Sequence, residues 1–142
     1  MFDPKDIVSL EDEIQEVLSK GDFLWIIHAD KIPPHIGLSK KGEYYSLKMG
    51  GKDTAVPLQK LLLVLEKKAI TSLCVQLKNG INEGAIESVF SKYTSCDYDQ
   101  SSCLQPIQEV LDCPMQHAVI FDLLKQLESN NQLGDVYGCL LY

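Results

Sequence analysis

One short apolar run constrains the fold of this chain more than any other feature. Residues 23–28 read Phe-Leu-Trp-Ile-Ile-His, after Gly21 and before a loop that contains Pro33 and Pro34. A run this short, rich in aromatic and β-branched side chains, favours a buried strand. Two successive prolines cannot join a strand ladder, so we expect a loop over 29–34. The sequence therefore predicts a sheet that holds this strand in its interior.

Further strand-like segments follow the prolines. Residues 35–39 and 43–49 flank a turn that contains Gly42, which is typical of a β-hairpin. The segment 50–53, Gly-Gly-Lys-Asp, indicates another break in the chain. Two later apolar runs, 70–77 and 133–141, also have the composition of strands.

Amphipathic segments alternate with these strands. Ser9 can cap a helix that ends at Gly21, and Pro57 suits the first position of the next helix. Helical spacing of apolar residues recurs three more times, in segments near 85–90, 104–111 and 120–127. We therefore predict one α+β domain over residues 1–142, built as a small antiparallel sheet with helices packed on it.

Composition excludes several classes of protein. The chain has 142 residues, 45% of them hydrophobic, and a formal net charge of −7. The apolar fraction argues against disorder, and the acidic balance argues against nucleic-acid or membrane partners, which are bound mainly through clustered lysine and arginine. No apolar run approaches the roughly 20 residues of a membrane span. The N-terminus lacks the order of a signal peptide, so we expect a cytoplasmic protein.

The five cysteines give no sign of a disulfide framework or of a bound cofactor. Their number is odd, and no two have the spacing CxxC. Cys113 and His117 could supply two metal ligands, but a structural zinc site needs four, so we expect no metal. Cys74 lies within an apolar strand-like run and is expected to pack as a small buried side chain.

Cys103 differs from the other cysteines because it lies at the start of a predicted helix, after Ser101 and Ser102. The unpaired N–H groups and the positive end of the helix dipole favour a thiolate there. A thiolate is the form that a nucleophilic cysteine needs, and the same N–H groups could serve as an oxyanion hole. His35 opens a strand directly after the prolines, so its imidazole is held in a fixed direction. A pair of Cys103 and His35 would combine a nucleophile with its general base.

These segments resemble the permuted papain-like cysteine hydrolases, in which the catalytic histidine precedes the catalytic cysteine. That branch includes lecithin:retinol acyltransferase-like proteins and bacterial amidohydrolases. The resemblance is carried by His35-Ile36-Gly37-Leu38, by the glycine-turned strand after it, and by Ser102-Cys103-Leu104, and it covers roughly residues 23–112. It implies a papain-like fold and thioester chemistry on a small amide, ester or peptide substrate, with Cys103 as nucleophile and His35 as base.

One position departs from that family. Its members usually carry a third polar group on the strand after the glycine turn, where this chain has Lys48, and a lysine cannot accept the imidazole N–H. If 23–28 and 35–39 pair as a hairpin, His28 would lie near His35, and Asp30 could also reach it. The sequence thus leaves two functions open. One is a cysteine hydrolase or acyltransferase with Cys103, His35 and His28 in its site, and the other is a non-catalytic binding domain on the same scaffold.

Overall fold

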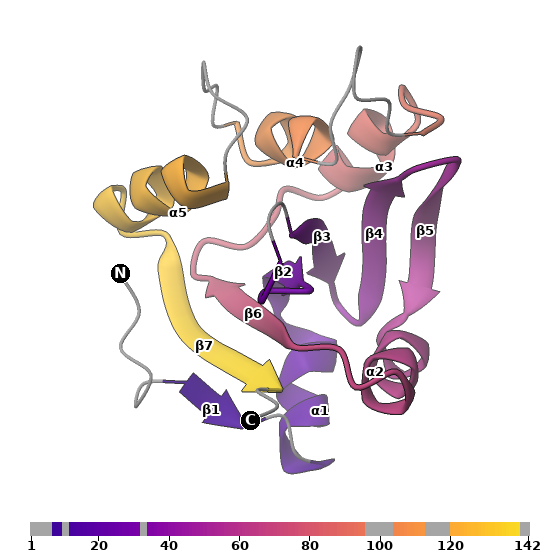
Figure 1. The fold of residues 1–142 in the computed structure, drawn as a ribbon. Helices are drawn as coiled ribbons and strands as arrows, with labels where there is room; N and C mark the ends of the chain where they lie inside the picture. The colour runs from indigo at the N-terminus through magenta and orange to yellow at the C-terminus, as the bar shows by residue number, and fades with distance from the viewer. Residues whose placement is uncertain (1–6, 10–11, 32–33, 96–103, 113–119, 140–142) are drawn as a thin grey trace.

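The fold is an α+β arrangement in which all strands belong to one open sheet (Figure 1). It is seen in a computed structural model that describes residues 7–9, 12–31, 34–95, 104–112 and 120–139. The strands are β1 (Ile7–Ser9), β2 (Asp22–Ile27), β3 (His35–Lys40), β4 (Glu43–Lys48), β5 (Gly51–Pro57), β6 (Ser72–Leu77) and β7 (Leu133–Cys139). The helices are α1 (Asp12–Lys20), α2 (Leu58–Lys67), α3 (Ala85–Phe90), α4 (Gln105–Val110) and α5 (Ile120–Ser129).

The strand order across the sheet is β1-β7-β6-β2-β3-β4-β5. The apolar run that begins at Phe23 forms β2, which pairs antiparallel with both β3 and β6 and is buried along its whole length. The prediction of a buried interior strand is therefore confirmed. Six strands form an antiparallel sheet, as predicted, and β1 adds one parallel pair with β7 at its edge.

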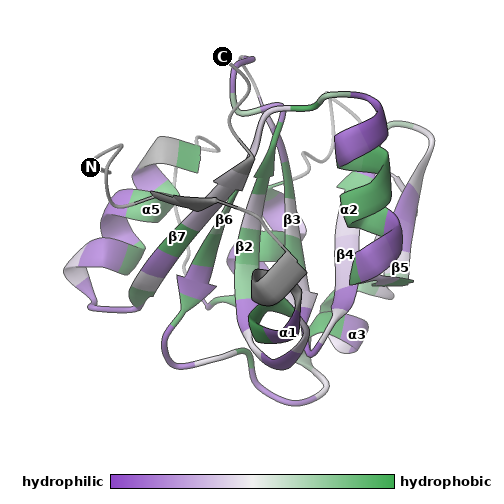
Figure 2. Ribbon diagram, turned by 90° about the horizontal axis from the view of Figure 1, so that it is seen from below, coloured by the Kyte–Doolittle hydropathy of each residue, from purple (hydrophilic) through white to green (hydrophobic). Residues whose placement is uncertain are grey.

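Helices cover both faces of the sheet and divide its apolar side chains into two clusters. The α1/α2 face carries Phe23, Trp25 and Ile27 of β2, packed with Leu18 of α1 and Leu58 of α2. The α3/α4/α5 face carries the alternate residues of the sheet, together with buried leucine, isoleucine and valine side chains of the three later helices. Figure 2 shows hydrophobic residues along β2, β3 and β6, which run side by side. Alternation along β2 thus fills both cores.

The hairpin predicted after the prolines is present, with a two-residue turn. Lys40 pairs with Glu43, and the connecting Lys41 and Gly42 have φ angles of 50° and 83°. Two successive positive φ angles are typical of the turn that matches the twist of paired strands. The Gly42 carbonyl also accepts the backbone N–H of Leu58 at the start of α2.

One local expectation was wrong. The segment 50–53 does not break the sheet, because only the Met49–Gly50 corner turns and β5 begins at Gly51. Ser9 is the last residue of the short strand β1 and α1 is described from Asp12, so a cap of α1 by Ser9 would involve residues 10–11, which lie outside the described residues. Both segments are held by pairing with a neighbouring strand, a tertiary contact that local composition does not reveal.

The predicted segments near 70–77, 85–90, 104–111, 120–127 and 133–141 all contain an element of the expected type. In the part of the chain that the structure describes, no helix has the length and apolar character that crossing a membrane requires.

Candidate functional site

His35 is the first residue of β3 and lies on the α1/α2 face of the sheet. It pairs directly with Ile27 of β2, and side chains of directly opposed residues point to the same face. Its ring is half-buried at the end of the strand. His35 therefore begins a strand directly after Pro34, as the sequence predicts.

A polar cluster surrounds this end of β3 and consists of His35, Ser46, Lys48 and Asp53. Ser46 Oγ donates to Asp53 Oδ2 at 3.1 Å, and Lys48 Nζ donates to Asp53 Oδ1 at 3.0 Å. The Lys48 side chain is 51% exposed and that of Asp53 is 29% exposed, so the pair is in contact with solvent. In the described part of the chain, no hydrogen bond engages the His35 ring.

Asp53 reaches this cluster because of a β-bulge. The register between β4 and β5 shifts, so that Tyr44 pairs with Val56 whereas Ser46 pairs with Asp53. Ala55, inside the bulge, has a φ of 50°. A regular ladder would have placed Thr54 opposite Ser46. Bulges often re-aim a side chain beside a functional site, and here the extra residue brings a carboxylate to the cluster.

Electrostatics favour the neutral form of the His35 imidazole. Burial is the largest influence and lowers the pKa of His35 below its ordinary value of 6.5. Asp53 raises this pKa, while the positive charges of Lys48 and His28 lower it. The net effect keeps the ring unprotonated near neutral pH, and an unprotonated imidazole is the form that can accept a proton.

The structure brings His28 into the surroundings of His35, as the sequence predicts. β2 and β3 pair antiparallel, and His28 follows the last residue of β2 with a φ of 57°. Asp30 is exposed in the next loop, and the carboxylate that acts on His35 is Asp53 instead. Asp53 was not among the predicted site residues, because the glycines of 50–53 indicate a break in the chain. The signal that could have found it is the alternation of β-branched Thr54 and Val56 after it.

Cys103 lies outside the described residues, as do Cys96 and Cys113, so the predicted pair with His35 stays a prediction. The next residue, Leu104, is buried in the α3/α4/α5 cluster, and α4 contacts β3. The helix that follows Cys103 therefore packs on the strand that carries His35, but on the opposite face from the His35 side chain. Cys74 is fully buried, and burial raises the pKa of its thiol, which confirms its predicted packing role.

Gly37, the glycine of the His-Ile-Gly-Leu segment, has a steric role. A Cβ atom at this position would lie 2.4 Å from the hydroxyl oxygen of Tyr44 and 2.5 Å from its ring. The Tyr44 ring is buried against Gly37 and meets Trp25 edge-on, and the Trp25 indole N–H donates to Ser39 Oγ at 2.9 Å. This part of the motif therefore packs the core beside the polar cluster.

The polar cluster does not have the composition of a metal site. Among the described residues, no group of three or more histidine, cysteine, aspartate or glutamate side chains is placed to hold a metal ion. The chain matches no family model, no curated protein and no solved structure.

Proposed function

We propose that the chain is a cysteine hydrolase or acyltransferase of permuted papain-like fold, acting on an amide or ester. The observation that carries the proposal is the half-buried His35, whose pKa is lowered by burial, in one cluster with the carboxylate of Asp53. A general base needs an unprotonated nitrogen together with a neighbour that stabilises the imidazolium formed during the reaction. Asp53 supplies the carboxylate that the Lys48 position lacks.

In the proposed reaction the Cys103 thiolate attacks the substrate carbonyl and forms a carbon–sulfur bond. His35 holds the proton taken from the thiol and gives it to the departing amine or alcohol, which leaves a thioester. Water, or an acceptor alcohol or amine, then attacks the thioester and regenerates the thiol. The helix after Cys103, α4, contacts β3, the strand of the base, so the proposal requires the Cys103 sulfur to reach round the end of this strand to the His35 face.

Alkylation across pH tests this proposal. We expect iodoacetamide to label Cys103 well below the ordinary thiol pKa of about 8.5, and faster than Cys96 in the same chain. His35→Ala should abolish this difference and Asp53→Asn should reduce it, whereas Asp135→Asn, at an exposed aspartate of β7, serves as a matched control for the loss of a carboxylate. Release of p-nitrophenol from p-nitrophenyl acetate, lost in Cys103→Ser, would give the second readout. Equal labelling of Cys103 and Cys96 at every pH would overturn the proposal.

A non-catalytic binding domain on the same scaffold is the second candidate. It is favoured by one specific observation, since Leu104 packs on the face opposite to the His35 side chain. If the Cys103 sulfur follows that face, the two groups cannot exchange a proton. This candidate predicts that iodoacetamide labels Cys103 slowly, with the pH dependence of an ordinary thiol. It also predicts that Cys103→Ser retains ligand binding. Fast labelling that depends on His35 would exclude it.

A further inference from the structure

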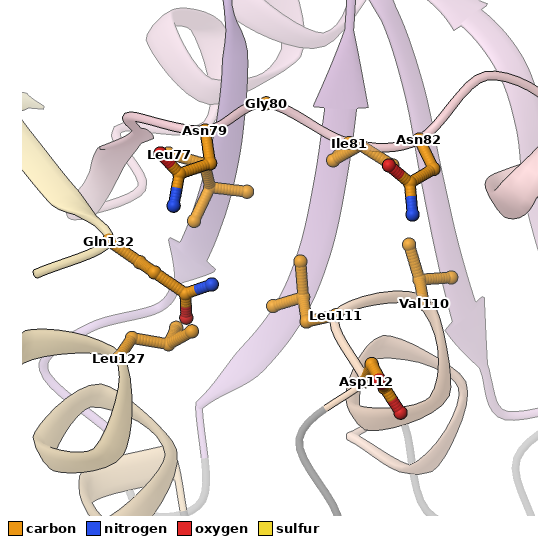
Figure 3. A pocket seen from close by; sticks show the side chains of 10 residues that line it. All are labelled: Leu77, Asn79, Gly80, Ile81, Asn82, Val110, Leu111, Asp112, Leu127 and Gln132. Atoms are coloured by element: carbon orange, nitrogen blue, oxygen red, sulfur yellow. The ribbon is translucent and has the colours of Figure 1, made fainter. Parts of the chain in front are cut away.

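A pocket of about 220 Å³ lies away from His35, between the β6–α3 loop, the end of α4 and the end of α5 (Figure 3). Leu77 closes it from the end of β6, and Leu127 lines it from α5. Val110 and Leu111 line it from the end of α4. These elements belong to the α3/α4/α5 face, whereas the polar cluster of His35 lies on the other face. The pocket is therefore a separate site.

Three carboxamide side chains extend into this pocket. Asn79 and Asn82 come from the β6–α3 loop and Gln132 from the turn before β7, and Figure 3 shows all three directed toward the central space. No hydrogen bond to another residue engages any of these three amides within the part of the chain that the structure describes. Each amide offers two donors and an acceptor oxygen, so the site presents both kinds of hydrogen-bonding group.

The remaining walls of the pocket are aliphatic. Leu77, Val110 and Leu127 are buried, Leu111 is partly buried, and Figure 3 shows the Leu111 side chain rising into the middle of the space. The described residues of the lining include no aromatic ring. Nucleobases are commonly held by stacking on aromatic rings, so this lining suits a branched aliphatic group better than a flat ring.

Charge at the pocket disfavours anions. Among the described residues, Asp112 is the only charged one in the lining, and its carboxylate is directed away from the central space in Figure 3. No lysine or arginine of the described part of the chain lines the pocket, and the whole chain has a formal net charge of −7. A carboxylate or phosphate ligand would meet repulsion without a cationic partner. An uncharged polar ligand fits this environment best.

The loop that carries the two asparagines is held in place by buried polar contacts. The Ile81 backbone N–H donates to Asp22 Oδ2 at 2.6 Å, and Lys40 Nζ donates to the Ile81 carbonyl at 2.5 Å. The Gly80 N–H donates to the Leu77 carbonyl, with Gly80 at a φ of 69°. The amides therefore project from a fixed frame, which lowers the entropy lost when a ligand is bound.

We propose that this pocket binds an uncharged carboxamide or peptide group that carries a branched aliphatic side chain. The three amides would exchange hydrogen bonds with the ligand's N–H and C=O groups, and the aliphatic side chain would lie against Leu77, Val110 and Leu127. Such a ligand is either a small free amide or a segment of a peptide, and the chemistry of recognition is the same for both. The proposal does not depend on Cys103 or His35.

Titration of the full ¹⁵N-labelled chain with N-acetyl-leucinamide tests it by NMR. We expect saturable shifts of the side-chain amide resonances of Asn79, Asn82 and Gln132. Asn82→Ala and Gln132→Ala should each weaken binding about fivefold to tenfold, the usual value of one hydrogen bond. Asn130→Ala, an exposed asparagine outside the pocket, is the matched control and should bind normally.

Two further ligands sharpen the test. N-acetyl-leucine, the anionic analogue, should bind at least about tenfold more weakly because it lacks a cationic partner in the pocket. Acetyl-Gly-Leu-Gly-amide separates the two sources of ligand, since tighter binding than N-acetyl-leucinamide indicates a peptide and weaker binding indicates a small amide. Cys103→Ser should bind normally, so failure of the hydrolase proposal leaves this one intact. Absence of saturable shifts, or binding unchanged in both pocket variants, would overturn it.

Discussion

A lysine–aspartate pair lies near each end of β3, and the two pairs have different environments. At the Lys40 end, Lys40 Nζ lies 3.1 Å from Asp22 Oδ2, and the side chains are 15% and 9% exposed. At the His35 end, Lys48 and Asp53 lie 3.0 Å apart, with side chains that are 51% and 29% exposed. The same chemistry thus occurs once in the interior and once in contact with solvent.

The partners of each pair explain the difference. Asp22 and Lys40 also bind the N–H and the C=O of Ile81, so the buried charges are satisfied and hold a loop in place. Asp53 binds Ser46 and Lys48 and leaves the titratable ring of His35 beside it without a hydrogen bond to the described residues. A cluster with such a ring can take part in chemistry, whereas the satisfied cluster stabilises the fold. The following predictions test this distinction.

The largest effect is expected from Asp22→Ala. This change leaves the Lys40 charge buried without its partner and removes the acceptor of the Ile81 N–H. We expect a loss of about 3 kcal/mol in the free energy of unfolding, measured by urea denaturation. Asp53→Ala, the matched change at the other end of β3, should cost much less. Equal losses in the two variants would show that the two pairs do not differ as described.

Gly37→Ala, between the two ends of β3, should have the next largest effect. The added methyl group would collide with the buried Tyr44 ring, and overpacking of this kind costs about 2 kcal/mol. The same substitution in a Tyr44→Leu background should cost clearly less, because the ring that collides is gone. Urea denaturation of the four chains in this double-mutant cycle measures the coupling. Additive losses would place the cause elsewhere than in the contact of Gly37 with Tyr44.

A smaller, pH-dependent effect is expected from His35→Gln. Burial lowers the pKa of His35 in the folded chain, so the unfolded chain binds the proton more readily. The stability linked to the neutral ring is present above the unfolded pKa of about 6.5 and is lost as the pH falls through the lowered value. Between about pH 7.5 and about pH 5, the parent chain should therefore lose more stability than the variant. Urea denaturation at both pH values measures this difference, with His28→Gln for comparison. If the parent chain instead became more stable relative to the variant at low pH, the lowered pKa of His35 would be contradicted.

Lys48→Ala should have the smallest effect. Exposed ion pairs contribute about 0.5 kcal/mol or less, and Lys48 is half-exposed. We expect the loss of stability to fall within that range and to shrink further in about 0.5 M salt, where charges are screened over shorter distances. A loss above about 1.5 kcal/mol would show that this pair is structural, like Asp22 and Lys40.

Local pattern was sufficient to predict the interior of the sheet. The uninterrupted apolar run of β2 and the glycine in the turn between β3 and β4 are properties of single segments, and both predictions are confirmed. β1 and β5 are different, because each is a strand only by virtue of a neighbour. Ile7–Ser9 pairs with residues more than a hundred positions later, and no local property of these residues shows that partner.

In the candidate site, too, some features follow from local pattern and others depend on contacts that local pattern does not show. The proximity of His28 and His35 follows from pairing of two adjacent segments, so the sequence could predict it. The approach of Asp53 depends on a bulge in β5, and although Thr54 and Val56 are typical of a strand, no local property of these residues shows where the register shifts. Cys103 lies outside the described residues. Alkylation kinetics are the direct way to test whether His35 activates its thiol.

The bulge at Ala55 also affects how well β5 can pair with a strand of another molecule. β5 is the last strand of the sheet, and an edge strand offers unpaired backbone groups to a strand from another molecule. A bulge with a positive φ breaks the regular spacing of those groups, and Pro57 removes one N–H at the end of the strand. The irregularity that brings Asp53 toward His35 therefore also makes this edge a poor template for aggregation.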